Sequence, residues 1–252
     1  MGPFARSLIV VPAVAALALA ACQKHDAAPA AASHGEMPMG GRHGPSWSDP
    51  DAKLFFQLAL LEGHLNIGRE LIDTGHKDQS LPHFGHPVRE LYGDIRPLLQ
   101  RRNVPQFYRD LVKLEALAAS APEGAEFKAT FQKVMAEVDA ARASIPQATQ
   151  GTRAFRLGIA ADVLRTAAQE YRNAVVAGKV ENAVEYHDAR GFVFYARALM
   201  GAGAEPQPAA KAVLDKAAVA VGPLEPPLTP IMTPEAFDAL AARLEAIRDG
   251  KA

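Results

Sequence analysis

Residues 50–75, PDAKLFFQLALLEGHLNIGRELIDTG, form the stretch that decides the fold of this chain. Apolar or small residues recur in it at alternating intervals of four and three, which is the spacing of one face of an α-helix. Asp49 is a favourable N-cap, Pro50 suits the first helical position, and Gly75 suits the residue after the last turn. We therefore predict a long, deeply buried helix over residues 50–74. The recurring positions are Leu54, Leu58, Leu61, Leu65, Gly68 and Ile72.

The composition of the 252-residue chain favours an all-α fold. Hydrophobic residues make up 49% of the chain, but aromatic residues make up only 7%, and pleated sheets depend on aromatic and β-branched side chains. Alanine, the strongest helix former, is abundant. No segment has the pattern of a strand. The formal net charge of −1 gives no basis for nucleic acid as a partner.

The helical pattern of the opening stretch returns 103 residues later and ends at a second glycine, Gly178. Identities at this offset include glycine and proline at equivalent places, which favours an internal duplication. We predict that residues 49–146 and 150–249 are two copies of a four-helix unit, either in tandem or fused into one larger bundle. The identical pairs are Leu54/Leu157, Leu61/Leu164, Gly75/Gly178, Tyr92/Tyr195, Pro105/Pro208, Leu111/Leu214 and Lys113/Lys216.

Caps and turn residues divide each copy into four predicted helices. Pro87 disfavours helical geometry at the residue before it, so it should kink or restart the second helix. The predicted helices span 50–74, 78–101, 105–120 and 123–143 in the first copy, and 152–177, 179–201, 207–221 and 234–248 in the second.

The first 21 residues have the features of a secretory signal. Arg6 carries the single positive charge, and residues 7–21 are apolar and small. This apolar run is too short to span a bilayer, which takes a helix of about 20 residues. We expect residues 1–21 to be a signal peptide.

The signal ends in Leu19-Ala20-Ala21-Cys22, which resembles a bacterial lipobox. The resemblance implies cleavage before Cys22 and lipid attachment to it, and thus a membrane anchor in the cell envelope. Gln23 at the next position favours the outer membrane, facing the periplasm, in a Gram-negative host. Residues 22–48 are rich in alanine, proline and glycine, so we expect a flexible tether. Its histidines and methionines could collect metal weakly, but we favour biased composition as their explanation.

Motifs of the common catalytic sites are missing from the sequence. It contains no glycine-rich phosphate loop, no G-x-S-x-G and no H-E-x-x-H. Cys22 is the only cysteine, so a disulfide and thiol catalysis are excluded if it carries lipid. We expect a protein that is not an enzyme.

Three histidines of the first copy could converge on a metal ion. His64 lies 11 residues before Gly75 and His86 lies 11 residues after it, so a helical hairpin would place them at similar heights. His83 lies one turn from His86. Neutral imidazole is a good ligand for copper, zinc or iron. The competing interpretations are buried histidines bonded within the core and surface histidines at the Pro87 kink; Glu62 and Glu90 are the nearby carboxylates.

The second copy places His187 on a predicted core stripe. Glu170 lies nearly as far before Gly178 as His187 lies after it, so the two could face each other. They would form either a simple pair or a second set of metal-supporting residues. Glu181, Glu185 and Asp188 form an acidic stripe that we interpret as a solvated face.

The secreted, duplicated helical body with a histidine in its first long helix is similar to the imelysin-like family. That family includes periplasmic components of bacterial iron uptake and carries a G-x-H-x-x-E motif. Here only His64 fits the motif, because Glu62 and Ile67 stand where glycine and glutamate are expected. The resemblance implies only that His64 is a metal ligand.

Two main hypotheses follow. The first is a periplasm-facing lipoprotein that binds or handles a transition metal through His64, His83 and His86, with His187 and Glu170 in support. The alternative is an anchored helical scaffold that binds an envelope partner and no metal. A third hypothesis is a small-molecule carrier with a pocket between the copies, lined by Tyr92, Tyr171, Phe194 and Tyr195.

Overall fold

The long helix expected at the start of the body is α1 (Pro50–Asp73). The Asp49 side chain caps it by accepting a hydrogen bond from the Asp51 amide at 2.9 Å, and Pro50 occupies its first position. The chain leaves the helix through Gly75, whose φ of +89° suits glycine. Two thirds of the α1 residues are buried, so the helix runs through the core. The computed structural model describes residues 48–202 and 207–251, and the predicted signal peptide, Cys22 and nearly all of the tether lie outside them.

The helix after Gly75 is one continuous rod with a wide turn in its middle. It consists of α2 (Lys77–His86), the π-helical turn η1 (Pro87–Leu91) and α3 (Tyr92–Arg101). Pro87 has no amide hydrogen to donate, and the Tyr92 amide instead bonds to the Pro87 carbonyl, five residues back. Pro87 therefore widens one turn and does not end the helix. Two further helices, α4 (Tyr108–Ser120) and α5 (Ala125–Ala143), complete the first half.

The second half has the same order of long helices. They are α7 (Arg153–Ala174), α8 (Ala183–Gly201), α9 (Pro208–Ala220) and α10 (Pro234–Arg248), preceded by a short unpredicted helix, α6 (Gln147–Gln150). The expected all-α fold is confirmed, because helices make up nearly all of the regular structure of the described residues. Gly75 and Gly178 both have positive φ at the ends of corresponding helices. The duplication itself stays a prediction.

The expectation that no strand would form is wrong at one place. Strands β1 (Val175–Val176) and β2 (Lys179–Val180) pair as an antiparallel hairpin between α7 and α8. The two turn residues, Ala177 and Gly178, both have positive φ, as a tight hairpin turn with the correct twist requires. β-branched valines at the strand positions favour extension over helix, so α7 ends three residues before the predicted end and α8 begins four residues late.

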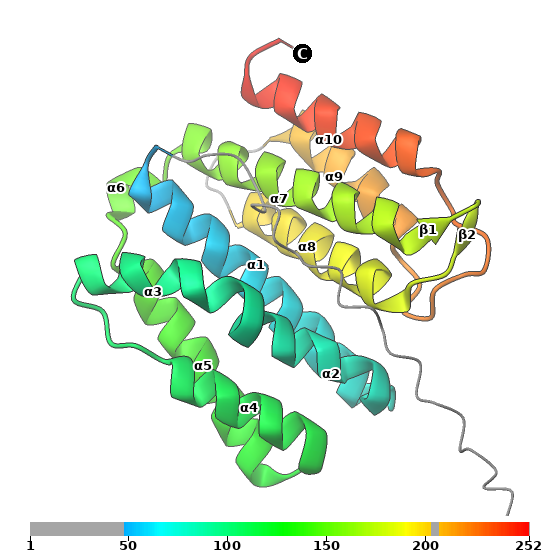
Figure 1. Ribbon diagram of the computed structural model, residues 1–252. Helices are drawn as coiled ribbons and strands as arrows, with labels where there is room; N and C mark the ends of the chain where they lie inside the picture. The colour runs from blue at the N-terminus through cyan, green and yellow to red at the C-terminus, as the bar shows by residue number, and fades with distance from the viewer. Residues whose placement is uncertain (1–47, 203–206, 252) are drawn as a thin grey trace, which may run out of the picture. The chain divides into compact units, whose positions relative to one another are not determined.

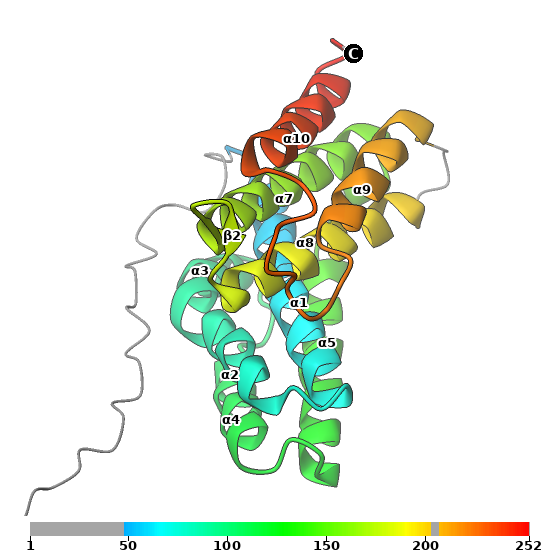
Figure 2. The same ribbon diagram turned by 90° about the vertical axis from the view of Figure 1, so that its right-hand side faces the viewer.

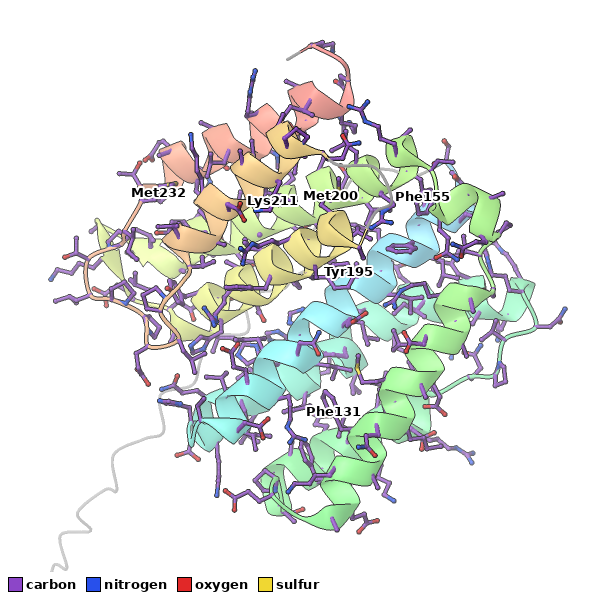
Figure 3. The ribbon with its side chains drawn as sticks, turned by 180° about the vertical axis from the view of Figure 1, so that it is seen from behind. Phe131, Phe155, Tyr195, Met200, Lys211 and Met232 are labelled. Carbon is purple, nitrogen blue, oxygen red and sulfur yellow. The ribbon has the colours of Figure 1, made fainter. Side chains whose placement is uncertain are left out.

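Helix α1 belongs to the first half and packs along the boundary between the two halves. It packs against α2 and α5 of its own half, and against α8 and α7 of the other, with α9 and α10 on the far side of α7 and α8 (Figures 1 and 2). Seen from behind, α1 lies between α8 and α5 (Figure 3). The Arg69 guanidinium of α1 lies over the Phe131 ring of α5. No helix within residues 48–202 or 207–251 is long and apolar enough to cross a membrane.

Helices α1 and α8 approach closely because each has a glycine at the crossing. A Cβ atom on Gly191 would lie 2.5 Å from the carbonyl oxygen of Gly63, and a Cβ atom on Gly63 would lie 2.7 Å from the ring of Phe192. Only glycine fits at such a separation. The crossing places His64, next to Gly63, beside the turn of α8 that carries Asp188.

Candidate metal centre

Four side chains from three helices converge at the crossing of α1 and α8. Each offers one nitrogen or carboxylate oxygen, and these atoms all lie within 4.8 Å of one another. The side chains of His64, His83 and Asp188 are 4%, 0% and 1% exposed, and that of His86 is 15% exposed. The group is thus a buried set of three imidazoles and one carboxylate: His64 of α1, His83 and His86 of α2, and Asp188 of α8.

All three histidines present Nδ1 to the same carboxylate. His64 Nδ1 lies 2.6 Å and His83 Nδ1 lies 2.8 Å from Asp188 Oδ1, both within hydrogen-bond distance. His86 Nδ1 lies 3.2 Å from Asp188 Oδ2. The edge of the Phe192 ring covers His64, with ring centroids 4.9 Å apart. The arrangement is compact and closed by an aromatic side chain.

His86 and Asp188 form an ion pair inside the group. His86 Nδ1 lies 3.2 Å from Asp188 Oδ2, and the negative charge of Asp188 raises the pKa of His86. A metal ion bound by both atoms would displace the proton of His86, because an imidazole nitrogen binds metal only in its deprotonated form.

The contacts to Asp188 are close to those between two ligands of one first-row metal ion. With bonds of about 2.0–2.2 Å, neighbouring ligand atoms lie about 3.0–3.4 Å apart, depending on whether the angle is octahedral or tetrahedral. The separations of 2.6, 2.8 and 3.2 Å reach this range after an opening of a few tenths of an ångström. The donor set suits such an ion, and the four ligand atoms, which lie within 4.8 Å of one another, would draw together around it.

Burial and mutual charge shift the pKa values of Asp188 and His64 in the direction that a metal ligand needs, and that of His86 in the opposite direction. Burial opposes ionisation of Asp188, but the three facing histidines outweigh it and hold its pKa well below the usual value. Burial lowers the pKa of His64 to about 4, so this imidazole is neutral at pH 7. His86 is the opposite case: burial lowers its pKa, but the charges of Asp188, Glu90 and Glu185 outweigh burial and raise it to about 9. His86 therefore carries a proton at pH 7 that an arriving metal would displace.

A family model described as the iron permease-associated 4-helix bundle domain matches residues 146–246. The match covers about two fifths of the chain and contains Asp188, whereas the three histidines precede it. This protein is similar to that family over its second half. No curated protein and no solved structure gives a match. The four-residue group thus combines one residue of the matched region with three outside it.

The structure brings together the three histidines that the sequence analysis singled out, and it places the other two candidates beside them. His187 is buried with its ring centroid 5.6 Å from that of His83, but its Nε2 donates to the Leu224 carbonyl at 2.9 Å. Its Nδ1 is buried without a hydrogen-bond partner in the described part of the chain. Glu170 is buried and hydrogen-bonded to Glu185, and burial and that bond raise its pKa to about 10.

Asp188 is the residue that the sequence analysis missed. We interpreted it as part of a solvated acidic stripe, which is wrong, because α8 turns this side chain toward α1 and α2 and leaves it 1% exposed. A signal was present: Gly63 precedes His64, and Gly191 follows Asp188 by three residues. Glycines at these positions indicate two helices in close approach, which would have brought Asp188 to His64.

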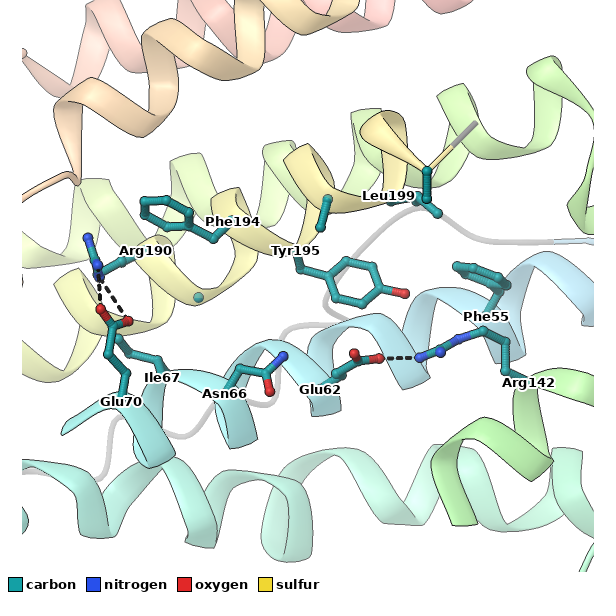
Figure 4. Close-up of a pocket in the computed structure, with 13 residues that line it drawn as sticks. Phe55, Glu62, Asn66, Ile67, Glu70, Arg142, Arg190, Phe194, Tyr195 and Leu199 are labelled. Atoms are coloured by element: carbon teal, nitrogen blue, oxygen red, sulfur yellow. Dashed lines mark hydrogen bonds and ion pairs between the residues drawn. The ribbon is translucent and has the colours of Figure 1, made fainter. Parts of the chain in front are cut away.

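A separate pocket of about 380 Å³ lies along α1 and α8, lined from α5 as well (Figure 4). Phe194 and Tyr195 line it as the carrier hypothesis expected, whereas Tyr92 and Tyr171 are buried in the core. Glu62 belongs to this pocket and pairs with Arg142, so it does not join the histidines as expected.

The charged groups of the pocket are already engaged with one another. Arg190 pairs with Glu70 at 2.6 Å and donates to the Val221 carbonyl at 2.9 Å, and its guanidinium lies 4.6 Å from the Phe194 ring centroid. The pair with Glu70 ties α8 to α1 (Figure 4), and the bond to Val221 ties α8 to the loop after α9. Internal pairing of this kind is typical of structural ion pairs, so the His–Asp group is the stronger candidate for function.

Proposed function

We propose that this protein binds a divalent transition-metal ion at His64, His83, His86 and Asp188 and handles that ion in the cell envelope without catalysing a reaction. The observation that carries the proposal is the convergence of four potential ligand atoms, three imidazole nitrogens and one carboxylate oxygen, within 4.8 Å of one another. A metal ion at their centre would bind all four side chains at once.

Iron(II) is the ion we propose first. Three imidazoles and one carboxylate form a mixed nitrogen and oxygen set that suits iron, zinc and copper(II) but is unlike the all-oxygen sites of calcium. The similarity of residues 146–246 to an iron permease-associated domain favours iron among these. Zinc and copper are the competitors that a binding experiment must include.

We further propose that the protein is held at the membrane by lipid on Cys22, with the body on the tether facing the periplasm. The support is the lipobox-like Leu19-Ala20-Ala21-Cys22 after an apolar signal segment. An envelope protein that receives or delivers the ion is the expected partner, and we expect no nucleic acid.

Anaerobic calorimetry tests the metal site directly. The full chain carrying Cys22→Ser, which prevents lipidation, would be titrated with Fe(II), Zn(II) and Cu(II). We expect one ion per chain with a dissociation constant below about 1 μM, corresponding to about −8 kcal/mol. The triple variant His64→Ala/His83→Ala/His86→Ala should lose this binding.

The tether supplies a matched control. The variant His25→Ala/His34→Ala/His43→Ala removes the same number of histidines from outside the body and should keep the binding. Equal binding by the triple body variant and the unsubstituted chain would refute the metal site. A stoichiometric envelope partner without co-purifying metal would then favour the scaffold hypothesis.

A further inference from the structure

The buried metal-binding group has one edge near solvent. His64, His83 and Asp188 are 4% exposed or less, but His86 is 15% exposed and the adjacent Glu90 is 23% exposed. The exposure of these side chains thus increases from Asp188 through His86 to Glu90. An ion that reaches the buried group by this edge meets Glu90 first.

The His86 ring connects the buried group with this edge. Its Nδ1 lies 3.2 Å from Asp188 Oδ2 on the inner side, and its Nε2 lies 3.9 Å from Glu90 Oε1 on the outer side. The two nitrogens of one imidazole thus face a buried carboxylate and a partly exposed one.

The backbone at Glu90 forms a π-helical turn and not an α-helical one. Glu90 lies in η1, where the missing amide of Pro87 accompanies a switch to five-residue hydrogen bonding. Single π-turns inside α-helices occur often at functional sites. This turn carries the Glu90 carboxylate on the same rod as His83 and His86.

A second carboxylate lies close to this edge. The charge of Glu185 raises the pKa of both His86 and Glu90. One oxygen of Glu185, Oε2, is buried without a hydrogen-bond partner in the described part of the chain. Carboxylates gathered at one edge raise the local concentration of cations and speed their arrival.

From this arrangement we propose that Glu90 is the exchange residue of the metal centre, the carboxylate that takes a hydrated divalent cation from solvent and passes it past His86 to the buried group. The inference rests on the proposed metal function and adds a route to it. Glu90 replaces one water of the arriving ion and is itself replaced by the buried ligands. Release follows the same path in reverse.

Stopped-flow loading with Co(II), whose visible spectrum reports coordination, tests this role. Glu90→Gln keeps the shape of the side chain and removes its charge, and we expect loading and chelator-driven release both to slow by about ten-fold at low salt. Because the two rates change together, the dissociation constant should change by less than about three-fold. Glu90→Asp, which restores a carboxylate, should recover most of the loading rate.

Glu126→Gln is the matched control. Glu126 lies on α5 and pairs with Lys113 at 2.7 Å, so its substitution removes one negative charge away from the exchange edge. Its loading rate should equal that of the unsubstituted chain. Glu90→Gln rates that match those of Glu126→Gln would overturn the proposal.

A second result would also overturn it. If Glu90→Gln weakens Co(II) binding by more than ten-fold and alters the Co(II) spectrum, Glu90 is a permanent ligand and not an exchange residue. Failure of the unsubstituted chain to bind any metal would instead reject the proposed function, so the two failures are distinguishable.

Discussion

The glycine crossing of α1 and α8 predicts a specific destabilisation by Gly191→Ala. The new methyl carbon would lie 2.5 Å from the Gly63 carbonyl oxygen and 3.2 Å from Ile67 Cγ2, whereas ordinary contact begins at 3.4 Å. The helices would have to separate by roughly 0.9 Å, because the obstacle is backbone and cannot rotate away. Over-packing of this kind costs about 1–3 kcal/mol.

Two further effects determine the net change in stability. Separation would lengthen the 2.6 Å contact between His64 Nδ1 and Asp188 Oδ1 beyond hydrogen-bond range, and a bond to a charged group contributes about 1.5–3 kcal/mol. The higher helix propensity of alanine offsets about 1 kcal/mol of this loss. We expect the free energy of unfolding to fall by about 2–3 kcal/mol in the metal-free protein.

Urea unfolding followed by circular dichroism, in the presence of a chelator, measures this change. Gly201→Ala is the matched control, because it lies on the same helix and a Cβ atom there would meet nothing within 4 Å. That variant should be as stable as the unsubstituted chain or slightly more stable. If Gly191→Ala were equally stable, the close crossing could not be what positions His64 and Asp188.

Three other predictions concern single groups. Asp188→Asn should weaken Fe(II) binding by at least about 100-fold in calorimetry, because a neutral amide replaces the carboxylate that faces all three histidines; a change below three-fold would exclude Asp188 as a ligand. Metal binding must displace the proton of His86, whose pKa is about 9, so affinity should rise about ten-fold per pH unit from pH 6 to pH 9 and then level off; a flat profile would contradict this assignment. Burial raises the pKa of Asp162 to about 6, so its protonated form favours the folded state, and this contribution is full below about pH 4 and lost as the pH rises through 6. Asp162→Asn should therefore raise the free energy of unfolding at pH 7 by up to about 3 kcal/mol and flatten its pH dependence between pH 4 and 6. Urea unfolding measures both changes. An unchanged pH dependence would show that the pairing of Asp162 with Arg248 at 3.2 Å already compensates for the burial of the carboxylate.

Most helices were predictable because their signals are local. Asp49 caps α1 at the expected residue, and α1 and α10 have nearly the predicted bounds. The errors occur where local signals compete. Valines on either side of Gly178 form a hairpin that shortens α7 and α8, and at Pro87 the helix continues through a π-helical turn and does not restart.

In the candidate site, too, the residues with local signals were predictable and the residue without one was not. The convergence of His64, His83 and His86 was predictable, since the three lie on two helices joined by a short turn at Gly75 and equal spacing from a turn sets equal height. The position of Asp188 in the site was not predictable, because Asp188 lies 124 residues from His64 and 105 residues from His83 along the chain. Periodicity assigns a residue to one face of its own helix but does not say which distant helix covers that face.

By itself, therefore, the sequence determined a largely helical body, the places of its main helices and three histidines at one height. Only the tertiary structure decided that the Gly63–Gly191 crossing presses α8 against α1, and that this contact buries Asp188 among the histidines. The physical reason is that hydrogen bonds and caps act within a few residues, whereas burial depends on which surfaces meet after the chain has folded.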